Sequence, residues 1–170
     1  MENASKALIM AATVLLGLMI ISVGVALFNT FSEFSTDTLE KVADKKVAEF
    51  NNNYMKYYGN MSLGKNEQEE VRPIPVTAHE IVSVANLAKK NNQEYELETQ
   101  NRYDENTYYI QVQVGKDSNF EKKTDQEKNI FLQENSLTEE NETKYYKCIE
   151  VKISEVTKRV MYIKFVEYED

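Results

Sequence analysis

The sequence predicts an α+β protein: a long N-terminal helix packed on a small, mainly antiparallel four-stranded sheet with one or two short helices. Three observations support this prediction. Residues 7–28 form an uninterrupted apolar run, a helical pattern continues from there to Tyr58, and alternating β-type segments fill much of the C-terminal half. The chain is expected to comprise a long helix at 1–58, with a transmembrane segment at about 7–28, a linker at 59–76 and an α+β head domain at 77–170.

Residues 7–28 contain no charged side chain, with Lys6 just before them and Glu33 as the first charge after them. A helix of this length covers roughly 33 Å, about the thickness of the hydrocarbon core of a bilayer. A secretory signal has a shorter apolar region and ends in a small-x-small cleavage site, which the stretch VGVALFNTFS lacks. A soluble core helix is seldom apolar on every face. An uncut membrane anchor is therefore favoured over a cleaved signal or a buried core helix.

The charges around the apolar run indicate how it crosses the membrane. Lys6 and the α-amino group precede it, whereas Glu33, Asp37 and Glu40 follow it before the next lysine. With one such run, we expect a single-pass protein of the cell membrane. Positive charge stays on the cytoplasmic side, and this rule sets the orientation. The N-terminus is therefore expected in the cytoplasm and the C-terminal domain outside.

The polar part of the chain is acidic. The formal net charge is −8, and since Glu2 and Lys6 cancel, all of it lies in residues 29–170. Such a surface repels a phosphate backbone, so nucleic acid is not expected among the partners. The partner that the composition does predict is the lipid bilayer.

Small residues recur inside the apolar run at helical spacing. Thr13, Gly17 and Gly24 fall near one face, and Ser22 lies four residues before Ala26. Small side chains let helix backbones approach closely in lipid, so Thr13, Gly17, Ser22 and Gly24 are candidates for helix packing and assembly. The alternative is that these residues are only the small residues that transmembrane helices usually contain.

The helix is expected to continue beyond the membrane, because no Gly or Pro occurs between Phe28 and Gly59. The simplest interpretation is one helix from about residue 4 to residue 58, roughly 80 Å long, with a left-handed cap at Gly59. Two helices with a break at Asn29-Thr30 are the alternative. Its second half carries an apolar stripe opposite acidic residues, and we expect the rest of the chain to cover that stripe. The stripe comprises Phe31, Leu39, Val42, Ala43, Val47, Phe50, Tyr54 and Tyr57.

Two short helices and four strands are expected in the head. A Thr-x-x-Glu capping box marks each helix: Thr77 with Glu80 for residues 78–91, and Thr124 with Glu127 for residues 124–135. In the third strand, Cys148 is expected on the same face as Glu150 and Lys152, with Ile149, Val151 and Ile153 on the other. The predicted strands are 95–100, 106–115, 144–154 and 158–169.

No motif for catalysis or cofactor binding occurs in the sequence. The single histidine, His79, has no metal-ligating neighbour and is expected on the surface of its helix. The single cysteine, Cys148, has no histidine nearby in sequence to activate it. Five glycines leave little room for a phosphate-binding loop. We therefore expect no enzymatic activity, no cofactor and no metal.

The order of the elements resembles the architecture of type IV pilins and pseudopilins, including the Tad-like minor pilins. The likeness covers most of the chain: a helix with a lipid-compatible first half and an amphipathic second half, followed by an antiparallel sheet. Such pilins usually carry a glutamate a few residues into the mature helix, and Glu2 would take that part here. The segments ENASKALIMA and RVMYIKFVEYE are also similar to small membrane-anchored proteins of Firmicutes, which implies a bacterial cell envelope.

The resemblance implies a pilin-like structural protein that self-associates through its N-terminal helix. Its partners would be other copies or components of a pilin system, and its final location could be a surface filament. The alternative is a non-polymerising, single-pass binding or adaptor protein whose extracytoplasmic head recognises an envelope partner. Self-contact between copies in the native envelope separates the two hypotheses.

Overall fold

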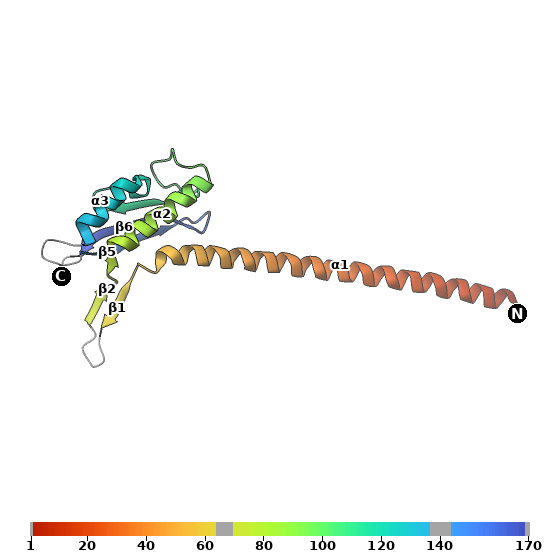
Figure 1. Cartoon of the computed structure of the whole chain (residues 1–170). Helices are drawn as coiled ribbons and strands as arrows, with labels where there is room; N and C mark the ends of the chain where they lie inside the picture. Colours follow the sequence, from red (N-terminus) through yellow and green to blue (C-terminus); the bar gives the residue numbers. More distant parts are fainter. Residues whose placement is uncertain (1, 64–69, 137–143, 169–170) are drawn as a thin grey trace. The chain divides into compact units, whose positions relative to one another are not determined.

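A computed structural model describes residues 2–63, 70–136 and 144–168, and it confirms the predicted α+β class (Figure 1). The residues fall into two compact units, one reaching to Lys46 and the other, the head, beginning at Val47. The elements in chain order are α1 (Glu2–Met55), β1 (Asn60–Leu63), β2 (Glu70–Pro73), β3 (Val76–Thr77), α2 (Ala78–Glu94), β4 (Gln111–Val114), the 3-10 turn η1 (Phe120–Lys122), α3 (Asp125–Ser136), β5 (Tyr145–Ile153) and β6 (Val160–Tyr168).

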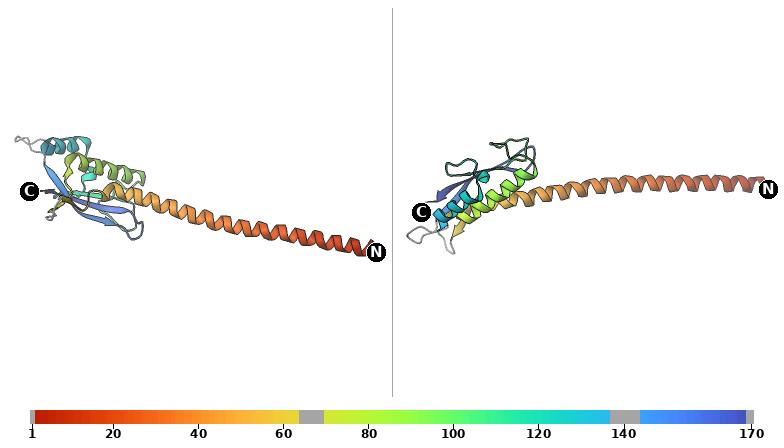
Figure 2. Two further views of the ribbon diagram at one scale, coloured as in Figure 1. Left: turned by 90° about the horizontal axis from the view of Figure 1, so that it is seen from below. Right: turned by 45° about the horizontal axis from the view of Figure 1, so that its top comes forward.

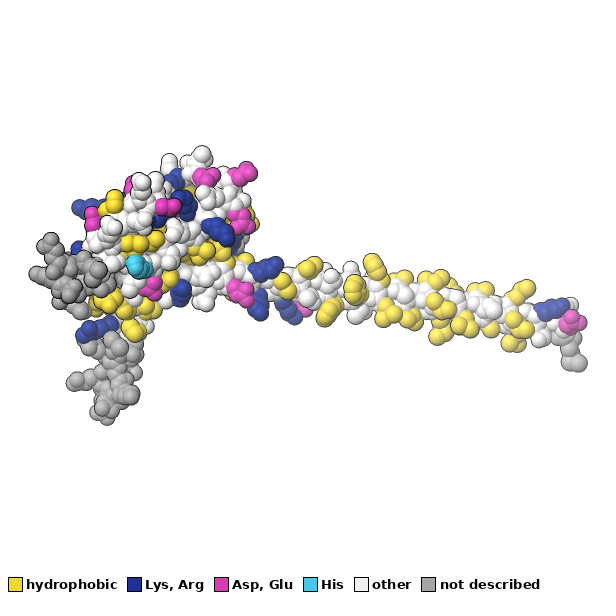
Figure 3. Space-filling model, viewed as in Figure 1, with side chains coloured by type: hydrophobic (Ala, Val, Ile, Leu, Met, Phe, Trp, Pro, Cys, Tyr) yellow, Lys and Arg dark blue, Asp and Glu magenta, His cyan; other side chains and the backbone are white. Residues whose placement is uncertain are grey.

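Helix α1 is unbroken, so the continuous helix is confirmed and the alternative break at Asn29-Thr30 is absent. Figure 3 shows apolar side chains projecting from its N-terminal part. By length and composition this part can cross a membrane, and a signal sequence near the N-terminus would meet the same criterion. Residues 2–55 contain no proline and only two glycines, so few residues oppose a continuous pattern of helical backbone hydrogen bonds.

The predicted end of α1 is wrong by three residues, because the helix ends at Met55 and not at Tyr58. The backbone of Tyr58 instead pairs with Cys148 of β5 in an isolated parallel bridge, and Tyr57 is buried in the head. Gly59 has φ +135, which lies outside the left-handed helical region, so the expected cap at this glycine is also wrong. Sheet pairing competes here with helix continuation and prevails.

The range 59–76, expected as a linker, contains β1 and β2, which pair antiparallel with Asn60 opposite Pro73. Pro73 lacks an N–H donor, which is tolerated because both strands of a two-stranded sheet are edge strands. The hairpin is closed at its base by a hydrogen bond from Ile74 N to Gly59 O at 3.2 Å.

Both predicted helices of the head are present and begin with the expected capping boxes. At α2, Thr77 N donates to Glu80 Oε2 at 2.8 Å, and Glu80 N donates back to Thr77 Oγ1 at 3.3 Å. At α3, Thr124 and Glu127 make the same reciprocal pair of bonds. Two N–H groups at each helix start are thereby satisfied. Helices α2 and α3 lie side by side against the sheet (Figure 2).

The main sheet has four strands in the order β3-β5-β6-β4. The β3–β5 and β5–β6 pairs are antiparallel, whereas β4 runs parallel to β6, so the sheet is mixed. One face is apolar and packs on the helices. On the other face, Tyr103 from the loop before β4 lies on Tyr162, with ring centroids 5.0 Å apart.

The strand predicted at 95–100 is wrong, and the fourth strand of the sheet is the short β3. Residues 95–97 instead terminate α2. Leu97 N donates to Asn92 O at 2.8 Å and Glu96 N to Gln93 O at 3.1 Å, while Glu96 takes φ 57. These two bonds form a Schellman motif, which usually places glycine where Glu96 stands. Because no glycine marks this position, the sequence pattern placed the helix end at residue 91, three residues early, and assigned the capping residues to a strand.

The strand predicted at 106–115 is shortened to β4 at Gln111–Val114. The side-chain amide of Asn92 takes the place of a neighbouring strand at Ile110: Ile110 N donates to Asn92 Oδ1 at 2.8 Å, and Asn92 Nδ2 donates to Ile110 O at 2.9 Å. An asparagine from α2 therefore satisfies the backbone that the pattern assigned to the strand ladder.

The predicted face of Cys148 is wrong, because a register shift separates Cys148 from Glu150 in β5. A bulge of this kind leaves one residue unpaired and reverses the alternation that follows it. Cys148 therefore faces the core with 7% exposure, whereas Ile149 is 43% exposed. Val151 packs on the core beyond the bulge, as predicted, but Ile153 is 42% exposed.

The core of the head brings together residues from every layer. Tyr54 from the end of α1, Ile81 and Ala85 from α2, and Ile163 and Phe165 from β6 are each fully buried and belong to one apolar cluster. The last turns of α1 are thus part of the head, and the part of the predicted apolar stripe that packs there comprises Phe50, Tyr54 and Tyr57.

Candidate functional site

The predicted packing residues Glu2, Thr13, Gly17, Ser22 and Gly24 all lie on α1. Thr13 Oγ1 donates to Met10 O at 2.9 Å, and Ser22 Oγ donates to Leu18 O at 2.8 Å. Both hydroxyls are therefore satisfied inside their own helix, which a hydrocarbon environment requires. The carboxylate of Glu2 forms an exposed ion pair with Lys6 at 3.0 Å.

The two glycines of α1 have no packing role within the described residues. A Cβ added at Gly17 or Gly24 would meet no atom within 4 Å. Each glycine nevertheless costs a helix about 1 kcal/mol relative to alanine. Their surfaces are open for the backbone of another helix to approach.

The unbroken helix places the small residues in phase with apolar residues that lie beyond the apolar run. At about 100° per residue, seven positions fall within an arc of about 80°, and we call them the assembly face. Ser22 lies on the opposite side from Gly24, so the helix does not bring all of the predicted residues together. The assembly face comprises Thr13, Gly17, Gly24, Phe28, Phe31, Leu39 and Val42.

The part of the assembly face beyond residue 28 is exposed and strongly apolar. Phe31 is 70% exposed, Leu39 is 68% exposed and Val42 is 46% exposed. Acidic residues lie on the opposite side of α1; they are Glu33, Asp37, Glu40 and Asp44. The expectation that the rest of the chain covers this stripe is therefore wrong for Phe31, Leu39 and Val42.

At the base of α1, within the head, Arg159 joins four segments. Its guanidinium carbon lies 3.7 Å from the centroid of the Phe50 ring, and its N–H groups donate to Tyr95 OH at 2.9 Å and Asn91 Oδ1 at 3.0 Å. Tyr95 stacks on Tyr108 with centroids 4.5 Å apart. The arrangement fixes the last turns of α1 to the end of α2 and to the β5–β6 turn.

Asn51 makes a second attachment at the same place. Its Nδ2 donates to Lys158 O and its Oδ1 accepts from Val160 N, both at 2.8 Å. Val160 is 2% exposed, so this side chain satisfies a buried backbone N–H that would otherwise lack a partner. Asn51 is one of three consecutive asparagines, and nothing in the sequence distinguishes it from its two neighbours.

A buried acidic network lies between η1 and β4. Glu121, 1% exposed, accepts from Tyr109 OH at 2.7 Å and from Val112 N at 2.9 Å. Burial raises the pKa of the Glu121 carboxyl, and the hydrogen bond from Tyr109 partly opposes this effect. The network fixes η1 against the edge of the sheet.

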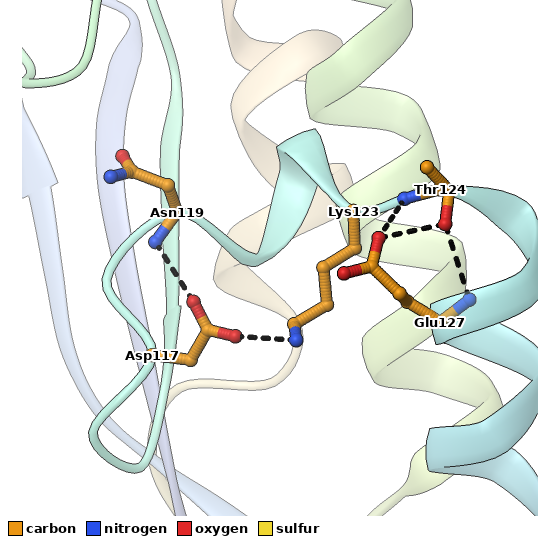
Figure 4. Close-up of polar contacts among 5 residues, drawn as sticks. All are labelled: Asp117, Asn119, Lys123, Thr124 and Glu127. Atoms are coloured by element: carbon orange, nitrogen blue, oxygen red, sulfur yellow. Dashed lines mark hydrogen bonds and ion pairs between the residues drawn. The ribbon is translucent and has the colours of Figure 1, made fainter.

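The junction between η1 and α3 is shown in Figure 4. The ammonium of Lys123 pairs with Asp117 at 2.8 Å, beside the capping box of Thr124 and Glu127. The hydrogen bonds that Thr124 donates lower the pKa of Glu127, and the hydrogen bond with Asp117 raises the pKa of Lys123. The junction is accounted for by its role in starting α3.

The cysteine and the histidine of the head do not belong to a metal-binding cluster among the described residues. Burial raises the pKa of the Cys148 thiol to about 11, which suppresses the thiolate. His79 is exposed on the first turn of α2, as predicted. Within residues 2–63, 70–136 and 144–168, no group of three His, Cys, Asp or Glu side chains is placed to hold a metal.

The chain matches no protein-family model, no curated protein and no solved structure. What the structure shares with type IV pilins is the order of its parts: a long N-terminal apolar helix followed by a small mixed-sheet domain. A shared architecture does not establish a shared function, so the assembly face has to be argued from its own residues.

Proposed function

We propose that this protein is a membrane-anchored envelope protein that self-associates through the assembly face of α1, in the manner of a pilin or pseudopilin. The observation that supports the proposal is the phase of α1, in which small residues of the apolar run continue directly into exposed apolar residues beyond it. The head would then be the part presented to the surroundings, and it acts without catalysis.

In the lipid part of the helix, association depends on close packing. Apolar side chains gain little from meeting one another there, because lipid tails are equally apolar. Gly17 and Gly24 leave open surface at which a second backbone can approach, and Thr13 adds a third small residue on the same side. This part of the face determines how closely two helices can lie.

Beyond the lipid, association depends on the hydrophobic effect. Burial of Phe31, Leu39 and Val42 would stabilise a helix pair by about 1.5–3 kcal/mol for each side chain. The acidic residues on the opposite side of α1 would stay in water, since the face excludes them. A second copy of the chain meets both requirements, because it presents the same small and apolar residues at matching heights.

Cysteine cross-linking in native membranes tests the proposal. Leu39→Cys is expected to form disulfide-linked dimers, whereas Asp37→Cys, about 160° away on the same helix, is expected to remain monomeric. The native Cys148 can stay in place, because it is buried. Equal cross-linking of both variants would indicate random collision and would contradict the proposal.

A second pair of variants tests the part of the face in lipid. Gly24→Leu fills the face and is expected to abolish cross-linking through Leu39→Cys. Ala26→Leu places the same side chain about 160° away and is expected to leave cross-linking unchanged. Electron microscopy of sheared surface fractions then shows whether association extends to filaments.

The alternative proposal is a non-polymerising adaptor with the same anchor. It is favoured if Leu39→Cys links to one other protein and to no second copy. The orientation is tested separately: a cysteine in place of exposed Glu155 is expected to react with an impermeant maleimide in intact cells, since we propose that the head lies outside. Labelling that occurs only after lysis would show that the head lies in the cytoplasm.

A further inference from the structure

A hollow of about 300 Å³ lies in the head between the C-terminal half of α2, the segment that follows it, and η1. Lys89 and Gln93 line it from α2, Glu98 from the next segment and Lys122 from η1. Its volume is at the lower end of the roughly 300–1,000 Å³ typical of small-molecule sites. The hollow lies far along the chain from the assembly face, and nothing in the proposed self-association uses it.

The floor of the hollow is rigid because its polar atoms are already bonded. Tyr109 and Glu121, both almost fully buried, are joined by the 2.7 Å hydrogen bond between the phenol and the carboxyl group. Asn92 is held by both atoms of its amide on the backbone of Ile110. A site with walls of this kind needs little reordering when it takes up a ligand.

Two lysines, Lys89 and Lys122, and two glutamates, Glu98 and Glu121, line the hollow. The carboxyl group of Glu121 is already bonded by Tyr109 and by the backbone of Val112. Lys122 Nζ donates to Glu98 O at 2.9 Å and to Asn101 Oδ1 at 2.7 Å, which are both uncharged acceptors. Among the described residues, neither Lys122 nor Lys89 is within ion-pair distance of a carboxylate. Each of these two ammonium groups therefore lacks a carboxylate partner in direct contact within the described part of the chain.

A third ammonium lies behind the wall. Lys128 is 2% exposed, and its Nζ donates to Asn86 Oδ1 at 2.8 Å and to Glu121 O at 3.4 Å, again uncharged acceptors. Burial, together with the positive charge of Lys89, lowers the pKa of Lys128. The carboxylates of Asp125 and Glu121 partly oppose this lowering, so Lys128 lies near charges of both signs and is kept from the hollow by its burial.

We infer that this hollow is a binding site for a small organic anion, with a carboxylate or phosphate group held between Lys89 and Lys122. Hydrogen bonds from ammonium groups to anionic oxygens are about twice as strong as those between neutral groups. The aliphatic stems of the two lysines and the Tyr109 ring provide an apolar wall for the body of the ligand. Glu98 lies at the same hollow and opposes an anion, whereas the carboxyl group of Glu121 is taken up by its bonds to Tyr109 and Val112.

The full chain in dodecyl maltoside micelles, titrated by calorimetry, provides the test. The probes are benzoate, phenyl phosphate and the neutral benzyl alcohol. Benzoate or phenyl phosphate is expected to bind, and their ratio identifies which anionic group the site prefers. Equal binding of benzyl alcohol, or no heat from either anion at millimolar concentration, would overturn the inference.

Matched variants locate the site. Lys122→Gln and Lys89→Gln are each expected to weaken anion binding about tenfold or more, whereas Lys116→Gln, exposed after β4, is expected to leave it unchanged. Glu98→Gln is expected to strengthen binding, because it removes a repulsive charge. Lys89 makes no hydrogen bond with any described residue, so its replacement keeps the fold intact even if Lys122→Gln loosens η1. Unchanged affinity in Lys89→Gln would place the anion elsewhere and refute the assignment, and neither result bears on self-association.

Discussion

Replacement of Arg159 by alanine should loosen the attachment of α1 to the head. The change removes the guanidinium stacked 3.7 Å above Phe50 and its two hydrogen bonds to Tyr95 and Asn91. The stacked cation contributes about 1 kcal/mol, and each hydrogen bond contributes about 1 kcal/mol net. Tyr95 is 39% exposed, so part of the cluster is solvated and the lower end of these ranges applies. The free energy of unfolding of the head is therefore expected to fall by about 2–3 kcal/mol.

Urea unfolding of the full chain in neutral detergent, followed by near-UV circular dichroism of the tyrosines, measures this loss; the chain has no tryptophan. Arg159→Lys keeps the charge but loses the planar stack and one donor direction, so about half of the loss is expected. Arg102→Ala is the matched control, because that arginine is exposed and its side chain has no such partner among described residues; a change within about 0.5 kcal/mol is expected.

A double-mutant cycle with Phe50→Leu isolates the stacking contribution. A coupling of about 0.5–2 kcal/mol between Phe50 and Arg159 is expected for residues in direct contact. The reasoning is refuted if Arg159→Ala costs no more than Arg102→Ala, or if Arg159→Lys is as stable as the unsubstituted protein.

Three further predictions follow from buried groups of the head. Asn51→Ala leaves the buried Val160 N–H without a partner and should cost about 1–3 kcal/mol in urea unfolding, whereas Asn53→Ala, which loses only an exposed bond, should cost much less. With its pKa raised to about 11, Cys148 should resist iodoacetamide at pH 8 until urea unfolds the chain, and equal rates by intact mass in both states would disprove this. Glu121→Gln should flatten the stability profile in the acid range. The folded pKa of Glu121 lies above the unfolded one, so its contribution is complete below the unfolded pKa and declines as pH rises through the folded pKa; a parallel decline in the variant would contradict this assignment.

The long helix and both capping boxes could be predicted from the sequence because they depend on near neighbours. An apolar run without breakers forms a helix through bonds between residues four apart, and Thr77 with Glu80 closes a helix start three residues apart. The candidate small residues of α1 were found on the same basis. The assembly face followed only when the structure showed that no break alters the phase between Gly24 and Phe31.

The wrong predictions arose where a distant group replaced a local one. Asn92 satisfies Ile110 from 18 residues away, and this shortens β4. The pairing of Tyr58 with Cys148 ends α1 early, and the bulge beside Cys148 turns its side chain inward. No periodicity in the sequence carries information about such partners, because the hydrogen bonds that decide them form only after the chain has folded back on itself.

By itself, the sequence determined that the chain has a long apolar helix, an acidic polar part and no catalytic motif, since these follow from composition and from spacings of a few residues. The tertiary structure alone decided where α1 ends, which part of its apolar stripe is buried, and that Arg159 meets Phe50. It also brought Lys89 and Lys122 to one hollow, although they are far apart in the chain. The positive charges of Lys89 and Lys122 repel each other, so the packing of α2 on η1 must supply the free energy that holds both at one hollow.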